Sequence, residues 1–287
     1  MTTSPGPLPD LTGRTAIVTG ASGGIGAATA AALAARGARV VLAVRDEGRG
    51  ARAARAMSGL VEVRRLDLAD LASVHAFAAG WEEPLDLLVN NAGVSVPTRQ
   101  QTADGFELQF GTNHLGPFAL TALLLPRITG RVVSLSSQAE RMGRIDLGDL
   151  QAERTPYRES RVYAASKLAA LLFTAELQRR LTAAGSPVLV AAAHPGFVAT
   201  GMTAGSGGRA TRLAVRLLAQ APEQGALPVL LAATGDVPPG AFTGPERALH
   251  MRGGAQLIGR SRQARDAGLA RRLWEASEGL TGVRSSV

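Results

Sequence analysis

Short runs of apolar residues alternate along this chain with longer Ala-rich segments. The apolar runs predict strands at 14–20, 38–45, 61–68, 85–93, 131–137 and 187–196, with a weaker strand at 240–244. The longer segments predict helices at 23–37, 47–57, 105–125 and 161–181. Apolar strands that are each followed by a helix are typical of a parallel sheet covered on both faces. We therefore predict an α/β fold with a single doubly wound, Rossmann-type domain, whose parallel sheet has about seven strands with helices on both faces.

The length of the chain favours one large domain. Its 287 residues contain no internal repeat and no linker that would divide them. We expect residues 1–11 to form a flexible tail, and they lack the basic start and apolar stretch of a signal peptide. Residues 138–160 and 199–222 are irregular and polar or Gly-rich, and they follow the fifth and sixth strands. Because doubly wound sheets bind ligands at the carboxyl ends of their strands, we expect both segments to be substrate-side loops.

Composition narrows the classes of function. The chain has no Cys, which excludes disulfides and thiolate metal sites and favours a cytoplasmic protein. No apolar run is long enough to span a membrane, so we expect no membrane partner. The net charge of +8 comes from arginines that lie among acids without interleaved aromatic residues, which favours a solvated surface over an anionic ligand or nucleic acid. The four His residues show no ligand spacing, so we expect no metal site: His75, His114, His194 and His250.

The first predicted strand runs into the glycine-rich segment TGASGGIG at 19–26. Its glycines at Gly20, Gly24 and Gly26 allow a tight turn and a close approach of the backbone to a pyrophosphate at a helix N-terminus. A turn that follows a strand and precedes a helix is the context that distinguishes a dinucleotide site from an ordinary turn. We expect Ser22 and Ile25, in the same turn, to contact the cofactor as well.

The end of the second strand bears on the choice of cofactor. NAD enzymes commonly have an acid there that binds the adenosine ribose, but this chain has Val44 followed by Arg45. A guanidinium pairs well with a phosphate, so we predict NADP(H) in preference to NAD(H). The alternative is that Arg45 only solvates the strand end or stabilises the next helix.

Two further strand ends carry candidate cofactor contacts. Asp67, followed by Leu68, ends the third strand and could accept a hydrogen bond from the adenine amino group. Its alternative role is the N-cap of the next helix. The segment NNAG at 90–93 ends the fourth strand, where Asn91 could tie the central strands together while Ala92 and Gly93 let the cofactor pass close. A plain turn is the alternative.

The segment YAASK places Tyr163 and Lys167 four residues apart, on one face of a predicted helix. Lys167 is the only lysine of the chain, and the other thirty basic residues are arginines. A free phenol has a pKa near ~10, and a nearby cation lowers this pKa and favours the phenolate. A compact ammonium can approach the phenol and also bind two ribose hydroxyls, which a planar guanidinium cannot do in the same space. A solvent-exposed pair on the helix is the alternative.

Taken together and in this order, TGxxxGxG, NNAG, YxxxK and the segment HPGFVAT at 194–200 resemble the short-chain dehydrogenase/reductase family, over roughly residues 12–280. Within that family the segments at 104–121, 163–181 and 269–277 resemble the retinol-dehydrogenase-like branch. The resemblance implies that Ser137 binds the substrate oxygen, with Ser136 as the alternative, and that Asn113 kinks the long helix and holds a water of the proton relay. It also implies contacts with the nicotinamide end of the cofactor from the segment at 194–200, at Pro195, Gly196, Val198 and Thr200.

The resemblance implies an NADP-dependent oxidoreductase that interconverts a ketone or aldehyde and an alcohol. Its expected catalytic residues are Asn113, Ser137, Tyr163 and Lys167. We expect a small apolar carbonyl or alcohol substrate, and a homo-oligomer remains open. Two alternatives are a family member with epimerase or dehydratase chemistry and a non-catalytic NADP-binding scaffold.

Overall fold

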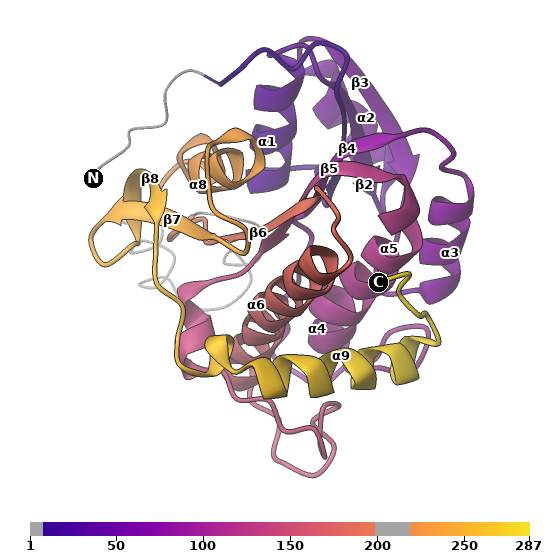
Figure 1. Ribbon diagram of the computed structural model, residues 1–287, viewed down its shortest axis with the longest axis vertical. Coiled ribbons are helices and arrows are strands. Elements are labelled where there is room, and N and C mark those ends of the chain that lie inside the picture. The colour runs from indigo at the N-terminus through magenta and orange to yellow at the C-terminus, as the bar shows by residue number, and fades with distance from the viewer. Residues whose placement is uncertain (1–7, 199–218) are drawn as a thin grey trace.

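A computed structural model describes residues 8–198 and 219–287, which form one α/β domain around an eight-stranded sheet (Figure 1). The order of the strands in the sheet is β3-β2-β1-β4-β5-β6-β7-β8. The chain reverses its direction of strand addition after β3, which is the doubly wound arrangement predicted from the sequence. The strands are β1 (Thr15–Thr19), β2 (Arg39–Val44), β3 (Leu60–Arg65), β4 (Leu85–Asn90), β5 (Ile128–Leu135), β6 (Leu189–Ala193), β7 (Phe242–Arg247) and β8 (Arg252–Leu257).

The sheet differs from the prediction at one edge. The seven strands β1 to β7 pair in parallel as expected. β8 is an additional strand that pairs antiparallel with β7. The sequence of β8, RGGAQL, has two glycines and buries only Ala255 fully, so it lacks the apolar run of a central strand. An edge strand that follows its partner through a short hairpin needs no such run.

Helices cover both faces of the sheet (Figure 1). The α-helices are α1 (Gly24–Ala34), α2 (Glu47–Arg55), α3 (Leu71–Ala79), α4 (Leu108–Phe110), α5 (Gly116–Leu124), α6 (Glu159–Ala183), α8 (Pro222–Thr234) and α9 (Ala267–Thr281). A π-helical turn at Gly111–Leu115 joins α4 to α5, and short 3-10 turns lie at Leu125–Arg127, Gln138–Met142 and Gln263–Arg265. The four helices predicted from the sequence are present. The apolar pattern does not predict the helices α3, α8 and α9.

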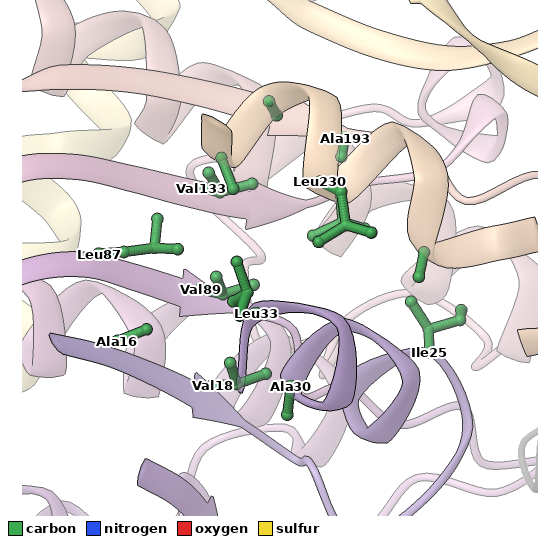
Figure 2. Close-up of a cluster of buried hydrophobic side chains, with 14 of the residues drawn as sticks. Ala16, Val18, Ile25, Ala30, Leu33, Leu87, Val89, Val133, Ala193 and Leu230 are labelled. Atoms are coloured by element: carbon green, nitrogen blue, oxygen red, sulfur yellow. The ribbon is translucent and has the colours of Figure 1, made fainter. Parts of the chain in front are cut away.

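The alternation of side chains along each strand divides the core into two layers. In β1, Ala16 and Val18 face α1 and α8, while Ile17 faces the opposite layer. Figure 2 shows the first layer, where Leu33 of α1 and Leu230 of α8 lie over strand residues of β1, β4, β5 and β6. The second layer holds α3, α5, α6 and α9 against the other face. Strands buried on both faces explain why their sequences read as continuous apolar runs.

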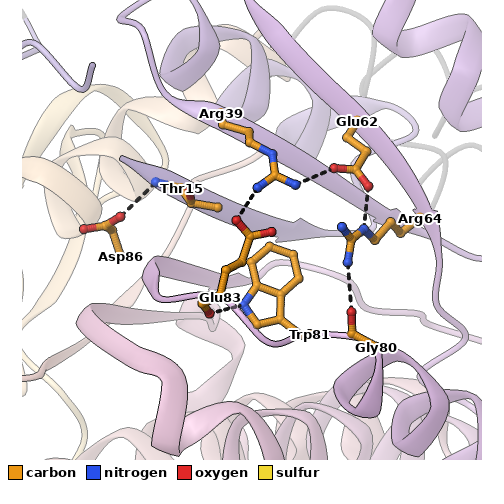
Figure 3. A network of polar contacts seen from close by, with 8 residues as sticks. All are labelled: Thr15, Arg39, Glu62, Arg64, Gly80, Trp81, Glu83 and Asp86. Atoms are coloured by element: carbon orange, nitrogen blue, oxygen red, sulfur yellow. Dashed lines mark hydrogen bonds and ion pairs between the residues drawn. The ribbon is translucent and has the colours of Figure 1, made fainter. Parts of the chain in front are cut away.

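Paired charges lie near the amino ends of the first strands (Figure 3). Arg39 donates to Glu83 at 2.5 Å and to Glu62 at 2.8 Å, and these two hydrogen bonds raise the pKa of Arg39. Arg64 donates to Glu62 at 2.5 Å and lies 4.9 Å from the centre of the Trp81 ring. Arg39 and Arg64 are therefore both paired with acids along these strands.

The described chain begins at Leu8, before β1. Leu8 and Leu11 pack against the α1 layer, and Leu11 N donates to Arg36 O at 2.8 Å. The rest of the expected tail, residues 1–7, lies outside the described residues, as does most of the expected loop at 199–222.

Candidate active site

A cleft of about 360 Å³ opens where the strands present their carboxyl ends. The loops after β1, β2, β3 and β4 form most of its walls, and α6 and the loop after β6 close one end. Fourteen of the predicted site residues line it: Gly20, Ser22, Gly24, Ile25, Gly26, Arg45, Asp67, Leu68, Asn91, Ala92, Gly93, Tyr163, Lys167 and Pro195. The structure therefore gathers residues that are spread over most of the sequence into one cavity.

The glycine-rich turn forms the floor of the cleft at the N-terminus of α1. Gly20 and Gly24 have φ of 66° and 56°, in the left-handed region that favours glycine. The first turn of α1 has no side-chain cap, so its backbone N–H groups remain available to an anion. A Cβ at Gly26 would lie 2.4 Å from Asn91 Nδ2 and 2.8 Å from Gly20 O. These features match the cradle that a pyrophosphate requires.

Gly26→Ala is expected to abolish tight cofactor binding, because the added methyl group displaces either Asn91 or the Gly20 carbonyl. Gly259→Ala is the control, since a Cβ there meets nothing within 4 Å and Gly259 does not line the cleft. Titration of each variant with NADPH, followed by cofactor fluorescence, should give a loss of at least about tenfold, or 1.4 kcal/mol, for Gly26→Ala alone. Equal losses in both variants would contradict this account of the turn.

Two arginines stand at the mouth of the cleft beyond β2. Arg45 and Arg49 are exposed and line the cleft, and neither forms an ion pair with any residue that the structure describes. Asp46 lies between them, but its carboxylate caps α2 by accepting from Arg49 N at 2.9 Å. The acid nearest to the expected ribose position is thus occupied, while the two guanidinium groups are free of carboxylate partners within the described part of the chain.

Asp67 lies on the cleft wall after β3. Its Oδ1 accepts from Ala69 N at 3.0 Å, which fixes the carboxylate in a tight turn. The N-cap of α3 is Asp70, whose carboxylate accepts from Ala72 N and Ser73 N. The alternative that Asp67 caps the helix is therefore wrong, and the side chain remains on the wall of the cleft.

The NNAG segment joins β4 to its neighbours. Asn91 Nδ2 donates to Thr19 O at 2.7 Å, and Thr19 Oγ1 accepts from the backbone N–H groups of Asn91 and Ala92 at 3.0 Å. Asn90 Nδ2 donates in the other direction, to Thr121 Oγ1 of α5 at 2.9 Å. The two amides tie β4 to β1 and to α5, so the segment is more than a plain turn.

Ser137 and Tyr163 meet at the inner end of the site. Burial raises the pKa of Tyr163 to about 12, and the nearby Ser137 side chain lowers it in part. Ser136, the alternative serine, is buried and donates its hydroxyl to Lys167 O at 2.7 Å. Ser136 lines the cleft but its hydroxyl is already used in this bond, whereas Ser137 lies outside the cleft lining and is hydrogen-bonded to Tyr163.

Lys167 lies beneath Tyr163 in the interior of the protein. Its side chain is 4% exposed, and its Nζ is 5.5 Å from the centre of the Tyr163 ring and donates to Leu135 O at 3.1 Å. Burial lowers the pKa of Lys167 to about 8. The alternative of a solvent-exposed pair on the helix is wrong. The pKa of Tyr163 is raised rather than lowered, because the loss of solvation exceeds the effect of the Ser137 hydrogen bond.

Asn113 lies in the π-helical turn that interrupts the long helix. Its Oδ1 accepts from Val94 N at 2.7 Å, and its Nδ2 donates to Val94 O at 3.0 Å and to Ser166 Oγ at 2.9 Å. The Asn113 amide thereby joins the loop after β4 to α6. Its contact on α6 is Ser166, the residue directly before Lys167. π-helical turns inside α-helices are rare and occur frequently at functional sites.

The segment after β6 is only partly in the cleft. Pro195 lines the cleft, whereas Gly196 and Val198 lie behind it, where Val198 is buried and pairs with Gln220. Gln220 supports the segment, since its Nε2 donates to Pro195 O at 2.7 Å and its N donates to Phe197 O at 2.9 Å. Thr200 lies outside the described residues.

The insert at 138–160 is anchored at several points. Gln151 Oε1 accepts from Glu107 N at 2.7 Å, and Tyr157 OH donates to Val96 O at 3.1 Å. Arg99 forms an ion pair with Glu153 at 3.1 Å. Loss of solvation at its half-buried position raises the pKa of Tyr157 to about 12, so its hydroxyl stays protonated and can donate. The insert is thus attached to the segments that flank Val94, on the side of the cleft next to Ser137 and Tyr163.

A family model described as short chain dehydrogenase matches residues 14–209. The chain belongs to the short-chain dehydrogenase family. Polyprenol dehydrogenase of Mus musculus is 41% identical over 295 residues, which cover 96% of this chain and 86% of that protein. Retinol dehydrogenase 13 of Homo sapiens is 40% identical over 298 residues, with coverage of 96% and 86%. The crystal structure of an uncharacterized protein from Mycobacterium paratuberculosis is 50% identical, with a TM-score of 0.86 and coverage of 98% of this chain and 97% of that one.

These similarities confirm that this short-chain dehydrogenase is close to the retinol-dehydrogenase-like branch. The family match and the relatives that are named dehydrogenases support an oxidoreductase that interconverts alcohols and carbonyl compounds with a nicotinamide dinucleotide, so the protein is an enzyme with a small-molecule substrate. Across residues 8–198 and 219–287, no helix is both long enough and apolar enough to cross a membrane.

Several residues of this short-chain dehydrogenase line the cleft without having been predicted. Arg49 shares the mouth of the cleft with Arg45, and Thr112 directly precedes Asn113 in the π-helical turn. Arg49 follows Arg45 by four residues, at the start of a predicted helix. Residues at this spacing lie on the same side of a helix, so the sequence could have indicated that Arg49 lies near Arg45. The remaining unpredicted positions are Thr19, Gly23, Ala43, Val44, Asp46, Leu66 and Leu135.

Proposed function

We propose that the protein is an NADP(H)-dependent oxidoreductase that interconverts an apolar aldehyde or ketone and the corresponding alcohol, with Tyr163 as the acid and base. The observation that carries the proposal is that Tyr163 and Lys167 line a cleft suited to a dinucleotide, with the Ser137 side chain hydrogen-bonded to Tyr163. A binding scaffold would need the cleft but not a buried phenol and ammonium beside it.

The described residues fit a nicotinamide dinucleotide along the whole cleft. The turn at Gly20–Gly26 would hold the pyrophosphate, Asp67 and Leu68 the adenine, and Lys167 the nicotinamide ribose. When bound, the cofactor supplies or accepts the hydride at the carbonyl carbon. The protein contributes the orientation of this group and the movement of the proton.

Three side chains manage the substrate oxygen and its proton. Ser137 and Tyr163 donate hydrogen bonds to the carbonyl oxygen, which stabilises the charge that develops there during reduction. Tyr163 then gives up its proton to that oxygen, and in alcohol oxidation its phenolate accepts the proton. The Lys167 ammonium lies close enough to favour the phenolate, and Asn113 connects the loop after β4 to α6 behind it.

Support for NADP(H) over NAD(H) comes from the mouth of the cleft. A 2′-phosphate adds negative charge where Arg45 and Arg49 are free of carboxylate partners in the described chain, and where Asp46 is occupied as a helix cap. Guanidinium groups bind phosphate through paired hydrogen bonds.

Arg45→Ala is therefore expected to weaken NADPH by at least about tenfold while leaving NADH within about twofold, since a charge-assisted hydrogen bond contributes roughly 1.5–3 kcal/mol. Arg52→Ala is the matched control, because Arg52 lies nearby on α2 and is likewise exposed but does not line the cleft. Dissociation constants for both cofactors measure the effect. Equal weakening of NADPH and NADH would mean that Arg45 has a structural role only.

The proposed substrate class rests on the apolar wall of the site and on the relatives. Val94 lines the cleft, and the insert at 138–160 packs beside it, so we propose that this insert contributes to substrate choice. The relatives named polyprenol dehydrogenase and retinol dehydrogenase support an alcohol or carbonyl compound with an apolar chain.

A screen of aldehydes, ketones and alcohols with NADPH, NADH and their oxidised forms tests the proposed function. The expected result is net oxidation of NADPH with an apolar aldehyde or ketone. Epimerase or dehydratase chemistry would convert a substrate without net oxidation of NADPH, and a scaffold would bind NADPH without any turnover. Either result would replace the proposal.

A further inference from the structure

The last helix of the described chain, α9, packs against the helical segments that carry Asn113, Tyr163 and Lys167 (Figure 1). Much of this contact is aromatic. The Trp274 ring lies parallel to Phe173 of α6, with centroids 5.8 Å apart, and meets Phe118 of α5 edge-on at 4.9 Å. α9 therefore belongs to the core behind the candidate site rather than to its cleft.

One polar contact lies inside this aromatic layer. His114 Nε2 is 2.8 Å from Ser277 Oγ of α9, and the His114 ring lies 5.0 Å from Phe110 between centroids. His114 is 3% exposed and Ser277 is fully buried. Burial lowers the pKa of His114 to about 3, so the ring is neutral at physiological pH.

The hydrogen bonds of Ser277 determine which His114 nitrogen carries the proton. Ser277 Oγ donates to Leu273 O at 2.7 Å, so its own proton is already used. Ser277 can then only accept from His114, and the neutral imidazole must carry its proton on Nε2. A buried N–H without an acceptor is unfavourable, so Ser277 is what stabilises this position of the His114 ring.

We propose that His114 and Ser277 are positioning residues for Asn113, an inference that rests on the proposed function. His114 directly follows Asn113 in the π-helical turn, and the two side chains are held by different elements. Asn113 binds Val94 and Ser166, whereas His114 binds Ser277. The π-helical turn is thus held by the side chains of two consecutive residues, Asn113 and His114. These contacts prevent the turn from relaxing into a regular α-helix, which would rotate Asn113 away from the site. Through this contact α9 takes part in the geometry of the proton relay.

Ser277→Ala tests the proposal, with Thr281→Ala as the matched control. Both residues lie on α9, are buried, and donate to a backbone carbonyl four residues earlier at 2.7 Å. Thr281 forms no hydrogen bond with the π-helical turn in the part of the chain that the structure describes. The two substitutions should therefore lower Tm to a similar degree, and only Ser277→Ala should affect the site.

Two measurements separate positioning from general stability. Hydrogen exchange of the Val94 amide, which donates to Asn113 Oδ1 at 2.7 Å, should become faster in Ser277→Ala and stay unchanged in Thr281→Ala. With an active substrate, kcat of Ser277→Ala should fall roughly tenfold with little change in the Kd of NADPH, since misplacement caused by a distant mutation can cost up to about a hundredfold. Unchanged Val94 exchange and kcat in Ser277→Ala would overturn the proposal. If the wild-type protein turned over no substrate, the proposed function would fail, while Val94 exchange would still decide whether Ser277 positions Asn113.

Discussion

Tyr163→Phe should lower kcat by at least ~10²-fold, the usual effect of losing a general acid or base. The substitution removes only the phenol hydroxyl group, which is the proposed source of the proton. This hydroxyl lies beside Ser137, and the Lys167 ammonium is 5.5 Å from the centre of the Tyr163 ring. The affinity for NADPH should change little because the aromatic ring remains. Steady-state kinetics and cofactor titration measure the two effects separately.

Tyr157→Phe is the matched control for this prediction, because Tyr157 is the other of the two tyrosines. Its hydroxyl donates to Val96 O and accepts from Gln109 Nε2 at 2.6 Å, so its removal loosens the insert without touching the proposed chemistry. Its kcat should stay within about tenfold of wild type, below the range typical of a lost general acid. Near-wild-type turnover of Tyr163→Phe would remove the assignment of Tyr163 as acid and base.

The pH dependence of alcohol oxidation follows from the same group. Burial raises the pKa of Tyr163 to about 12, so the phenolate is the minor form at neutral pH and its fraction grows as the pH rises. We therefore expect oxidation to become faster as the pH rises from neutral towards the Lys167 pKa of about 8, above which the ammonium that favours the phenolate is lost, and reduction, which uses the protonated phenol, to lack this increase.

Lys167→Arg keeps the positive charge but should still cause a severe loss of activity, at least ~10²-fold, with weaker binding of NADPH. The Lys167 side chain is enclosed, since a Cβ at Gly93 would lie 3.3 Å from its Nζ and the Nζ donates to Leu135 O. A larger planar guanidinium must displace Gly93, crowd Tyr163 or occupy the space expected for the ribose. Activity and NADPH affinity near wild type would show that only the charge of Lys167 matters.

Lys167→Met extends this prediction, because it removes the charge as well as the donors. Its loss should be at least as large as that of Lys167→Arg. Any remaining alcohol oxidation should need a higher pH than wild type, since the ammonium no longer favours the phenolate. Thermal unfolding of both variants shows whether the loss comes from the site or from the fold.

The sequence predicts those features that depend on local pattern. Strands β1, β2 and β4 are buried on both faces, so their apolar runs are unambiguous. The turn at Gly20–Gly26 and the spacing of Tyr163 and Lys167 are equally local. Each of these signals lies within a few residues of chain, and together they lead to the cleft.

Features that depend on distant contacts are not predictable in this way. β8 is stabilised by its hairpin partner rather than by its own apolar residues, so its sequence resembles a loop. The raised pKa of Tyr163 comes from burial by the whole fold, whereas the sequence shows only the neighbouring lysine. The π-helical turn and the Tyr157 contact with Glu107, at 3.2 Å, likewise depend on elements far apart in the chain.

Transfer of deuterium from NADPH that carries deuterium in both hydrogen positions at C4 of the nicotinamide tests the central claim most directly. The labelled cofactor is incubated with the protein and an apolar aldehyde or ketone, and mass spectrometry locates the label in the product. We predict deuterium on the former carbonyl carbon of the alcohol with wild-type protein, and a rate of labelling at least ~10²-fold lower with Tyr163→Phe. Product without deuterium at that carbon, or equal labelling rates for wild type and Tyr163→Phe, would contradict the account.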